Sequence, residues 1–245
     1  MGDKAPGPAL VRDLGFTDSV AIMVGVIIGV GIFRVPGSIA GYLHSPSAIL
    51  VAWVVGGLLA LCGGLCYAEL SASLPKTGGD YVYLREAYGP CVGFLFGWTK
   101  LLVIRPGSIA GVAFIFAGYA AYFLPLQAWG VRMVAVSVIL LLTALNVFGL
   151  RYGKLAQNLL VLGKIAGILF LIGAGLFWGE GSLELAPTES QGTVPLLGAF
   201  GMALIFVMWT YGGWNESTYM AGEMHRPAKD LPSSIALGIA LTILL

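Results

Sequence analysis

Two glycine-containing segments in apolar surroundings are the parts of this chain best suited to chemistry. The first reads GVIIGVGIFRVPG over 25–37, with Ile28, Gly29, Val30 and Gly31 near the middle of an apolar run. Glycine costs about 1 kcal/mol relative to alanine inside a helix, so we expect the helix to unwind here. In a bilayer, unwound N–H groups of a half-helix can bind a carboxylate, and freed carbonyls can hold a cation or an ammonium group. Glycines that serve close helix packing are the alternative interpretation.

The second segment reads WTYGGWN over 209–215 and repeats the same pattern. Gly212 and Gly213 lie at mid-span between aromatic residues, with Asn215 close by. Two interrupted spans at corresponding places in two halves of a chain indicate a transporter built from inverted repeats. This pairing is a stronger signal than either segment alone.

Three charged residues within apolar runs require either a compensating partner or a functional role, because charge is costly inside a bilayer. A lysine at mid-bilayer costs about 2.5–3.5 kcal/mol, and Lys164 has roughly ten apolar neighbours on each side, although it could snorkel to an interface. Glu216, next to the second break, could bind a cationic substrate, carry a proton or form a structural ion pair. For Arg34, past the first break, we favour a structural ion pair over contact with an acidic substrate or an outer gate.

The elements that must position these residues are membrane-spanning helices. The 245 residues are 58% hydrophobic and only 10% charged, with a net charge of +1. Soluble domains carry about 25% charged residues, so an ordinary cytosolic enzyme, a nucleic-acid binder and a disordered chain are excluded. The sequence predicts an all-α membrane protein. The expected spans are 16–43, 47–72, 92–124, 131–148, 155–178 and 196–221, with a seventh opening near 234.

The placement of basic residues predicts a cytoplasmic N-terminus. The acidic loop 179–195 contains no base, whereas the segments assigned to the cytoplasm carry most of the lysine and arginine. The tyrosine-rich segment 74–90 is predicted to form an interfacial helix on the cytoplasmic face, with a plain loop as the alternative. Its Gly78-Gly79-Asp80 sequence lacks the Lys-Ser/Thr of a phosphate loop, so we reject that function. The cytoplasmic bases are Lys4, Arg12, Lys76, Arg85, Arg151, Lys154, Arg226 and Lys229.

Four motifs together resemble the amino acid–polyamine–organocation (APC) superfamily, most closely its L-type and cationic amino acid transporter branch. The motifs are GVGIFRVPG, YAELSASLPKTGGDYVYLREAYGP (67–90), IRPGSIA (104–110) and YGGWNESTYMAGEMHRPAKDLPSSI (211–235). The resemblance implies a LeuT-type fold of two five-helix inverted repeats with helices 1 and 6 broken. Residues 1–245 would form one incomplete transporter domain, a C-terminally truncated fragment. It would hold the first repeat (16–178) and the start of the second (196–245), which is helix 6 and the beginning of helix 7.

The resemblance also assigns roles to individual residues. Lys164 matches a helix 5 lysine that takes the place of a sodium ion, and with Glu216 it is the candidate for ion-mimic or proton-coupling work. Val30 departs from the usual small residue, which would narrow or shift the site. Glu69 resembles a cytoplasmic gate region, and Trp209 and Arg34 are further gating candidates, with Trp209 as the lid over substrate. The implied substrate-binding set is Ile28, Gly29, Val30, Gly31, Trp209, Gly212, Gly213 and Asn215.

The function implied by the resemblance is sodium-independent secondary transport of amino acids by alternating access, as exchange or proton symport. The alternatives are an amino acid sensor with the fold of a transporter and a membrane-embedded enzyme. The sequence contains no catalytic motif that would favour the enzyme. No cofactor, metal or nucleic acid is expected. The loop FLPLQAWG (123–130) lacks the cysteine through which eukaryotic relatives join a glycoprotein, so no heavy chain is expected. A homodimer is a possible oligomeric state. The expected location is the inner or plasma membrane.

Overall fold

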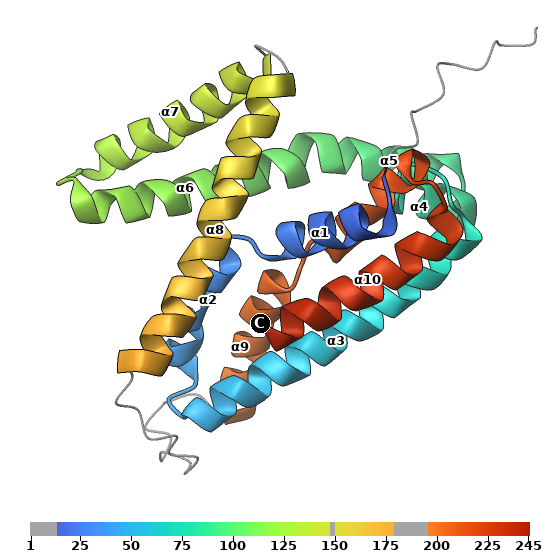
Figure 1. Ribbon diagram of the computed structural model, residues 1–245. Helices are drawn as coiled ribbons and strands as arrows, with labels where there is room; N and C mark the ends of the chain where they lie inside the picture. Colours follow the sequence, from blue (N-terminus) through green and yellow to red (C-terminus); the bar gives the residue numbers. More distant parts are fainter. Residues whose placement is uncertain (1–13, 148–149, 179–195) are drawn as a thin grey trace, which may run out of the picture. The chain divides into compact units, whose positions relative to one another are not determined.

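The computed structural model describes residues 14–147, 150–178 and 196–245, and in these ranges every named element is a helix (Figure 1). Five of the described helices are long and apolar enough to cross a membrane, or six if one bent pair is a single span. The chain divides into two compact units, Met1–Pro90 with Gly181–Leu245 and Cys91–Glu180. The predicted all-α membrane fold with interrupted first and sixth spans is therefore confirmed.

The first unit gathers helices from both ends of the chain. Its α3 and α10 lie side by side, and α1, α2 and α9 pack around them (Figure 1). The elements are α1 (Phe16–Ile27), α2 (Gly31–Tyr42), α3 (Pro46–Ser73), α4 (Asp80–Tyr88), α9 (Leu196–Thr210), the 3-10 helix η2 (Trp214–Glu223) and α10 (Pro227–Leu244). Their common core consists of aliphatic side chains, among them Met23, Ile27, Val35, Ile39, Val207, Leu231, Ile235 and Ile239.

Glycines on α3 explain how closely the helices of the first unit approach one another. A Cβ atom on Gly56 would collide with Val207 of α9, and one on Gly64 would collide with Ile239 of α10. Small residues at helix interfaces allow such close backbone approach within membranes, where packing replaces the hydrophobic effect as the driving force. Part of the high glycine content therefore serves close helix packing.

The second unit is a helical stretch followed by two further long helices. It begins within α5 (Pro90–Thr99), passes through the π-helical segment η1 (Lys100–Ile104) and continues as α6 (Arg105–Phe123), α7 (Ala128–Val147) and α8 (Leu150–Trp178). Ala113 and Ala117 on α6 pack against Ala135 on α7. The π-helical turn was not predicted, because hydropathy does not register a change of hydrogen-bond pattern inside an apolar run.

Most predicted spans agree with the observed helices to within a few residues. The seventh is the exception, because α10 begins at Pro227 and not near 234. Its first two turns contain polar residues, such as Asp230 and Ser234, that are buried in the structure and do not read as apolar in the sequence. The segment 74–90 contains the predicted helix as α4. The acidic loop 179–195 and the bases Lys4 and Arg12 lie outside the described residues.

Candidate functional site

The first predicted break lies between α1 and α2. The first helix ends at Ile27, the second begins at Gly31, and the two axes are bent by 41°. Ile28 leaves the helical conformation with a ψ of 81°, and the first hydrogen bond that reaches back from α2 runs from the N–H of Phe33 to the carbonyl of Val30 at 3.2 Å. Within the break, the N–H of Gly29 donates to the carbonyl of Ile27 at 2.7 Å. The N–H groups of Gly31 and Ile32 lie in the first turn of α2, where the helix itself supplies no acceptor.

The second predicted break lies between α9 and η2. The α9 helix ends at Thr210, and the turn that follows contains Gly212 and Gly213. Gly213 has a φ of +105°, a left-handed conformation that residues with a side chain rarely adopt. Beyond it the span continues as a 3-10 helix, η2, that begins at Trp214. The sequence correctly located the break, but it gave no indication of the 3-10 geometry.

The two breaks are in contact with each other. A Cβ built on Gly31 would lie 2.9 Å from the Oγ1 of Thr210 and 3.1 Å from its Cα, so the start of α2 touches the end of α9. A Cβ on Gly213 would lie 3.0 Å from the Cγ1 of Val26 in α1. A helix N-terminus carries partial positive charge and a helix C-terminus partial negative charge. At this point the chain therefore offers complementary partial charges for a carboxylate and an ammonium group on one small molecule.

The side chains around the second break differ in their surroundings. Trp209, the predicted lid, is 53% exposed and immediately precedes the last residue of α9. The side-chain amide of Asn215 donates a hydrogen bond of 3.1 Å to the Oδ2 of Asp80 on α4. Glu216 is half-buried, and its N–H donates to the carbonyl of Gly213 at 3.0 Å. The roles of these residues in substrate binding or proton coupling stay predictions.

The remaining candidates are Arg34, Glu69 and Lys164, on three different helices. Arg34 is exposed on α2, and among the described residues no carboxylate pairs with it, so the favoured structural ion pair is not observed there. Glu69 is exposed near the end of α3. Lys164 is half-buried on α8 in the second unit, whereas both breaks belong to the first. Its predicted contact with α1 therefore stays a prediction.

A buried carboxylate next to the second break was missed by the sequence analysis. Asp80 is 7% exposed at the start of α4, and its Oδ2 accepts the bond from Asn215 and another of 3.0 Å from the hydroxyl of Tyr219. Tyr67 of α3 also forms a hydrogen bond with this carboxylate. The available signal was an acid directly after Gly78-Gly79, which we had considered only as part of a phosphate loop.

Two aromatic rings contact Tyr67 of this polar cluster. Tyr67 meets Trp214 edge to face with ring centroids 5.0 Å apart, and it meets Tyr83 of α4 at 5.9 Å. Burial raises the pKa of the Tyr83 hydroxyl, a hydrogen bond with Thr218 lowers it, and the nearby Asp80 carboxylate raises it, with a net increase. Tyr83 therefore stays neutral at physiological pH and acts as a hydrogen-bonding group.

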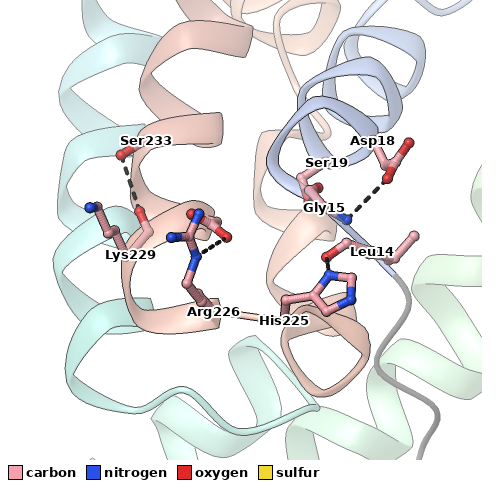
Figure 2. Close-up of polar contacts among 9 residues, drawn as sticks. Leu14, Gly15, Asp18, Ser19, His225, Arg226, Lys229 and Ser233 are labelled. Atoms are coloured by element: carbon pink, nitrogen blue, oxygen red, sulfur yellow. Dashed lines mark hydrogen bonds and ion pairs between the residues drawn. The ribbon is translucent and has the colours of Figure 1, made fainter.

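The start of α1 is joined to the end of η2 by backbone hydrogen bonds. The N–H of Leu14 donates to the carbonyl of Glu223 at 3.0 Å, and the N–H of His225 donates to the carbonyl of Leu14 at 3.1 Å. The His225 ring is directed at the same carbonyl (Figure 2), and its Nδ1 lies 3.0 Å from that oxygen. Arg226 donates from Nε to the carboxylate of Asp230 at 3.3 Å. The start of the first span and the end of the sixth therefore lie together.

Comparison with known proteins relates this geometry to a family. The sequence model described as "Amino acid permease" matches residues 14–245. The b(0,+)-type amino acid transporter 1 of Mus musculus is 35% identical over 95% of this chain and 49% of its own length. The serine/threonine exchanger of Bacillus subtilis (strain 168) is 33% identical over 95% of this chain and 52% of its own. The human large neutral amino acids transporter small subunit 2 is 33% identical over 98% of this chain and 46% of its own length.

The match covers nearly all of this chain, while the chain spans about half the length of the curated relatives it matches. These relatives are named as transporters or exchangers and not as enzymes. The broken spans, the membrane-length helices and the four motifs all lie within the matched region. The chain is an integral multi-pass membrane protein that belongs to the amino acid permease family, within the APC transporters.

Proposed function

We propose that the protein moves amino acids across a membrane by alternating access, with the substrate held where the two breaks meet. The observation that carries this proposal is the contact of Gly31, at the N-terminus of α2, with Thr210, at the C-terminus of α9. An α-amino acid carries a carboxylate and an ammonium group on one carbon, and these two helix ends offer the complementary partial charges within one contact distance. Selectivity for the side chain of the amino acid is then set by residues outside this contact.

We further propose that transport is sodium-independent and proceeds by exchange or by proton symport. The position of Lys164 near the middle of α8 supports a cation supplied by the protein in place of sodium. Exchange is supported by the Bacillus subtilis relative, which is named as a serine/threonine exchanger. Serine, threonine and large neutral amino acids, named for the relatives, are the first substrates to test.

We place the protein in the inner or plasma membrane with its N-terminus in the cytoplasm. The hydrogen bonds of Leu14 with Glu223 and His225 support this orientation, because they join the start of α1 to a turn followed by the basic residues Arg226 and Lys229. Positive charge marks the cytoplasmic side of membrane proteins. Protease accessibility of an N-terminal tag in intact cells and in inside-out vesicles tests the orientation.

We propose that the protein transports amino acids without a heavy-chain partner. One relative is named as a small subunit, but the segment 123–130 of this chain contains no cysteine. A single species with the mass of a monomer or homodimer, measured by light scattering on purified protein, would support the proposal. Activity that appears only after co-expression with a second chain would contradict it.

The deciding experiment uses the protein, in the longest form its gene encodes, reconstituted in liposomes. A panel of radiolabelled neutral, cationic and anionic amino acids is offered with sodium or choline outside, with and without a pH gradient. We expect uptake of at least one amino acid, unchanged by removal of sodium. Stimulation by unlabelled amino acid inside identifies exchange, and stimulation by the gradient identifies proton symport. Binding without uptake would indicate that the protein is a sensor and not a transporter. Breakdown of the substrate would indicate an enzyme.

A further inference from the structure

The carboxylate of Asp80 connects two segments that lie far apart in the sequence. It stands at the first position of α4, where the partial positive charge of a helix N-terminus stabilises an anion. Two donors to its Oδ2 atom, Asn215 and Tyr219, belong to η2. A buried carboxylate is costly unless it is hydrogen-bonded, and bonds to a charged acceptor are roughly twice as strong as neutral ones. Asp80 is therefore a strong link between α4 and η2.

The glycine before Asp80 allows this link to form. Gly79 has a φ of +48°, and a Cβ at this position would lie 2.5 Å from the Oγ1 of Thr218 and 2.9 Å from a ring carbon of Tyr219. A side chain at this position would therefore force the start of α4 and these η2 side chains to shift apart. The turn and the carboxylate thus act together, since the turn brings the backbones close and the carboxylate holds them.

The segment that Asp80 holds is a weak helix. A 3-10 helix has poorer hydrogen-bond geometry than an α-helix, and runs longer than three or four residues are uncommon, whereas η2 has ten residues. Its own side chains provide some support, because the hydroxyl of Thr218 donates to the carbonyl of Asn215 at 2.6 Å and that of Ser217 donates to Trp214 at 2.9 Å. Contacts with other elements must hold η2 in place, and Asp80 supplies two of them at one atom.

We propose that Asp80 is a positioning residue for transport: it fastens η2, the inner half of the sixth span, to α4, and this fastening opens and re-forms during each cycle. The proposal rests on the proposed function for its place in a cycle. The fastening itself does not depend on which substrate is carried. When the link is broken, the η2 segment spends more time away from α4, and its buried residues become accessible from the cytoplasm.

The test measures that accessibility directly and needs no substrate. The reporter is a cysteine at Ala221, which is 1% exposed on η2, in a background where the exposed cysteines Cys62, Cys66 and Cys91 are replaced by alanine. Inside-out vesicles are treated with a membrane-impermeant maleimide, and the labelling rate is measured. The test variants are Asp80→Asn, which keeps the size of the side chain, and Tyr219→Phe, which removes only the hydroxyl.

The matched control is Tyr81→Phe. Tyr81 is an exposed residue on α4 next to Asp80, so the control removes the same hydroxyl group from outside the cluster. We expect Tyr219→Phe and Asp80→Asn each to raise the labelling rate at position 221 roughly tenfold, as loss of one bond to a charged group would. The double variant should label little faster than the stronger single variant, because both substitutions remove the same interaction. Tyr81→Phe should label like the parent protein.

Transport provides the second readout. In liposomes, Tyr219→Phe should lower the maximal rate more than it raises the KM for external substrate, because the return step that re-forms the link is slowed. Labelling equal to that of Tyr81→Phe in both test variants would overturn the proposal. If the parent protein transports nothing while the two variants still label faster, the link is established and the proposed function fails. Unfolding is recognised separately, because it would lower the yield of monodisperse protein.

Discussion

Substitution of Gly31 by alanine tests the contact between the two breaks. The added methyl carbon would lie 2.9 Å from the Oγ1 of Thr210, 3.1 Å from its Cγ2 and 3.1 Å from its Cα. One of these atoms is backbone, so rotation of the threonine side chain does not relieve the clash. The start of α2 and the end of α9 must move apart by a few tenths of an ångström. Overpacking of this kind costs about 1–3 kcal/mol.

The cost should fall on substrate binding, because the displaced peptide groups are those proposed to hold it. A change of 1–3 kcal/mol corresponds to a roughly 5- to 150-fold weaker affinity. The control is Gly37→Ala in the same helix, where a Cβ would meet nothing within 4 Å. That substitution should be neutral or stabilising, since alanine is favoured over glycine in a helix by up to about 1 kcal/mol.

The assay is equilibrium binding of the best amino acid from the uptake panel to purified protein, together with thermal unfolding of each variant. The double variant Gly31→Ala/Thr210→Ala removes two of the three close atoms and should recover part of the affinity. An affinity for Gly31→Ala equal to that of Gly37→Ala would refute the placement of the substrate at this contact. A loss of folded protein without recovery in the double variant would show that the contact serves structure alone.

Three further predictions concern separate features. Lys164→Ala should abolish uptake without preventing membrane insertion, while Lys164→Arg retains some activity because it keeps the cation; wild-type uptake in the alanine variant would remove the ion-mimic role. Gly213→Ala should lower the unfolding midpoint, because its φ of +105° is unfavourable for alanine by about 1–2 kcal/mol, whereas Gly201→Ala, whose added methyl meets nothing within 4 Å, should not. Burial raises the pKa of Tyr83 above its ordinary value of 10.0, so the folded state keeps a proton that the unfolded state loses. Stability should therefore fall as the pH rises above about 10, and Tyr83→Phe should remove part of this loss while Tyr81→Phe does not.

The sequence predicted the helices and the two breaks because each depends on local properties. Apolar length determines where a span lies, and the glycines near Gly29 and Gly213 mark where a helix is least stable. The π-helical turn in the third span and the 3-10 geometry of η2 could not be predicted in this way. Both keep an apolar or amphipathic pattern while the backbone hydrogen bonds change, and that change depends on neighbouring elements.

The polar cluster was missed for a related reason. Asp80 and its donors Asn215 and Tyr219 lie more than 130 positions apart in the sequence, so no short motif unites them. The segment around Asp80 was identified as an interfacial helix, which α4 confirms as a helix. Asp80 itself was considered only as part of a phosphate loop, and nothing in the sequence indicated that it is buried, with 7% of its surface exposed. A buried carboxylate can be recognised only when the tertiary contacts that satisfy it are known.

The discontinuous composition of the first unit has a consequence for biosynthesis. Its opening part ends at Pro90 and its closing part begins at Gly181, so the ribosome delivers α5 to α8 before the missing partners emerge. Until α9 and α10 arrive, Gly56 and Gly64 lack the side chains of Val207 and Ile239 that pack against them. Assembly of this unit is therefore completed late, and nascent chains arrested before α9 should leave the Gly56 and Gly64 face of α3 open to membrane chaperones or lipid-phase crosslinkers.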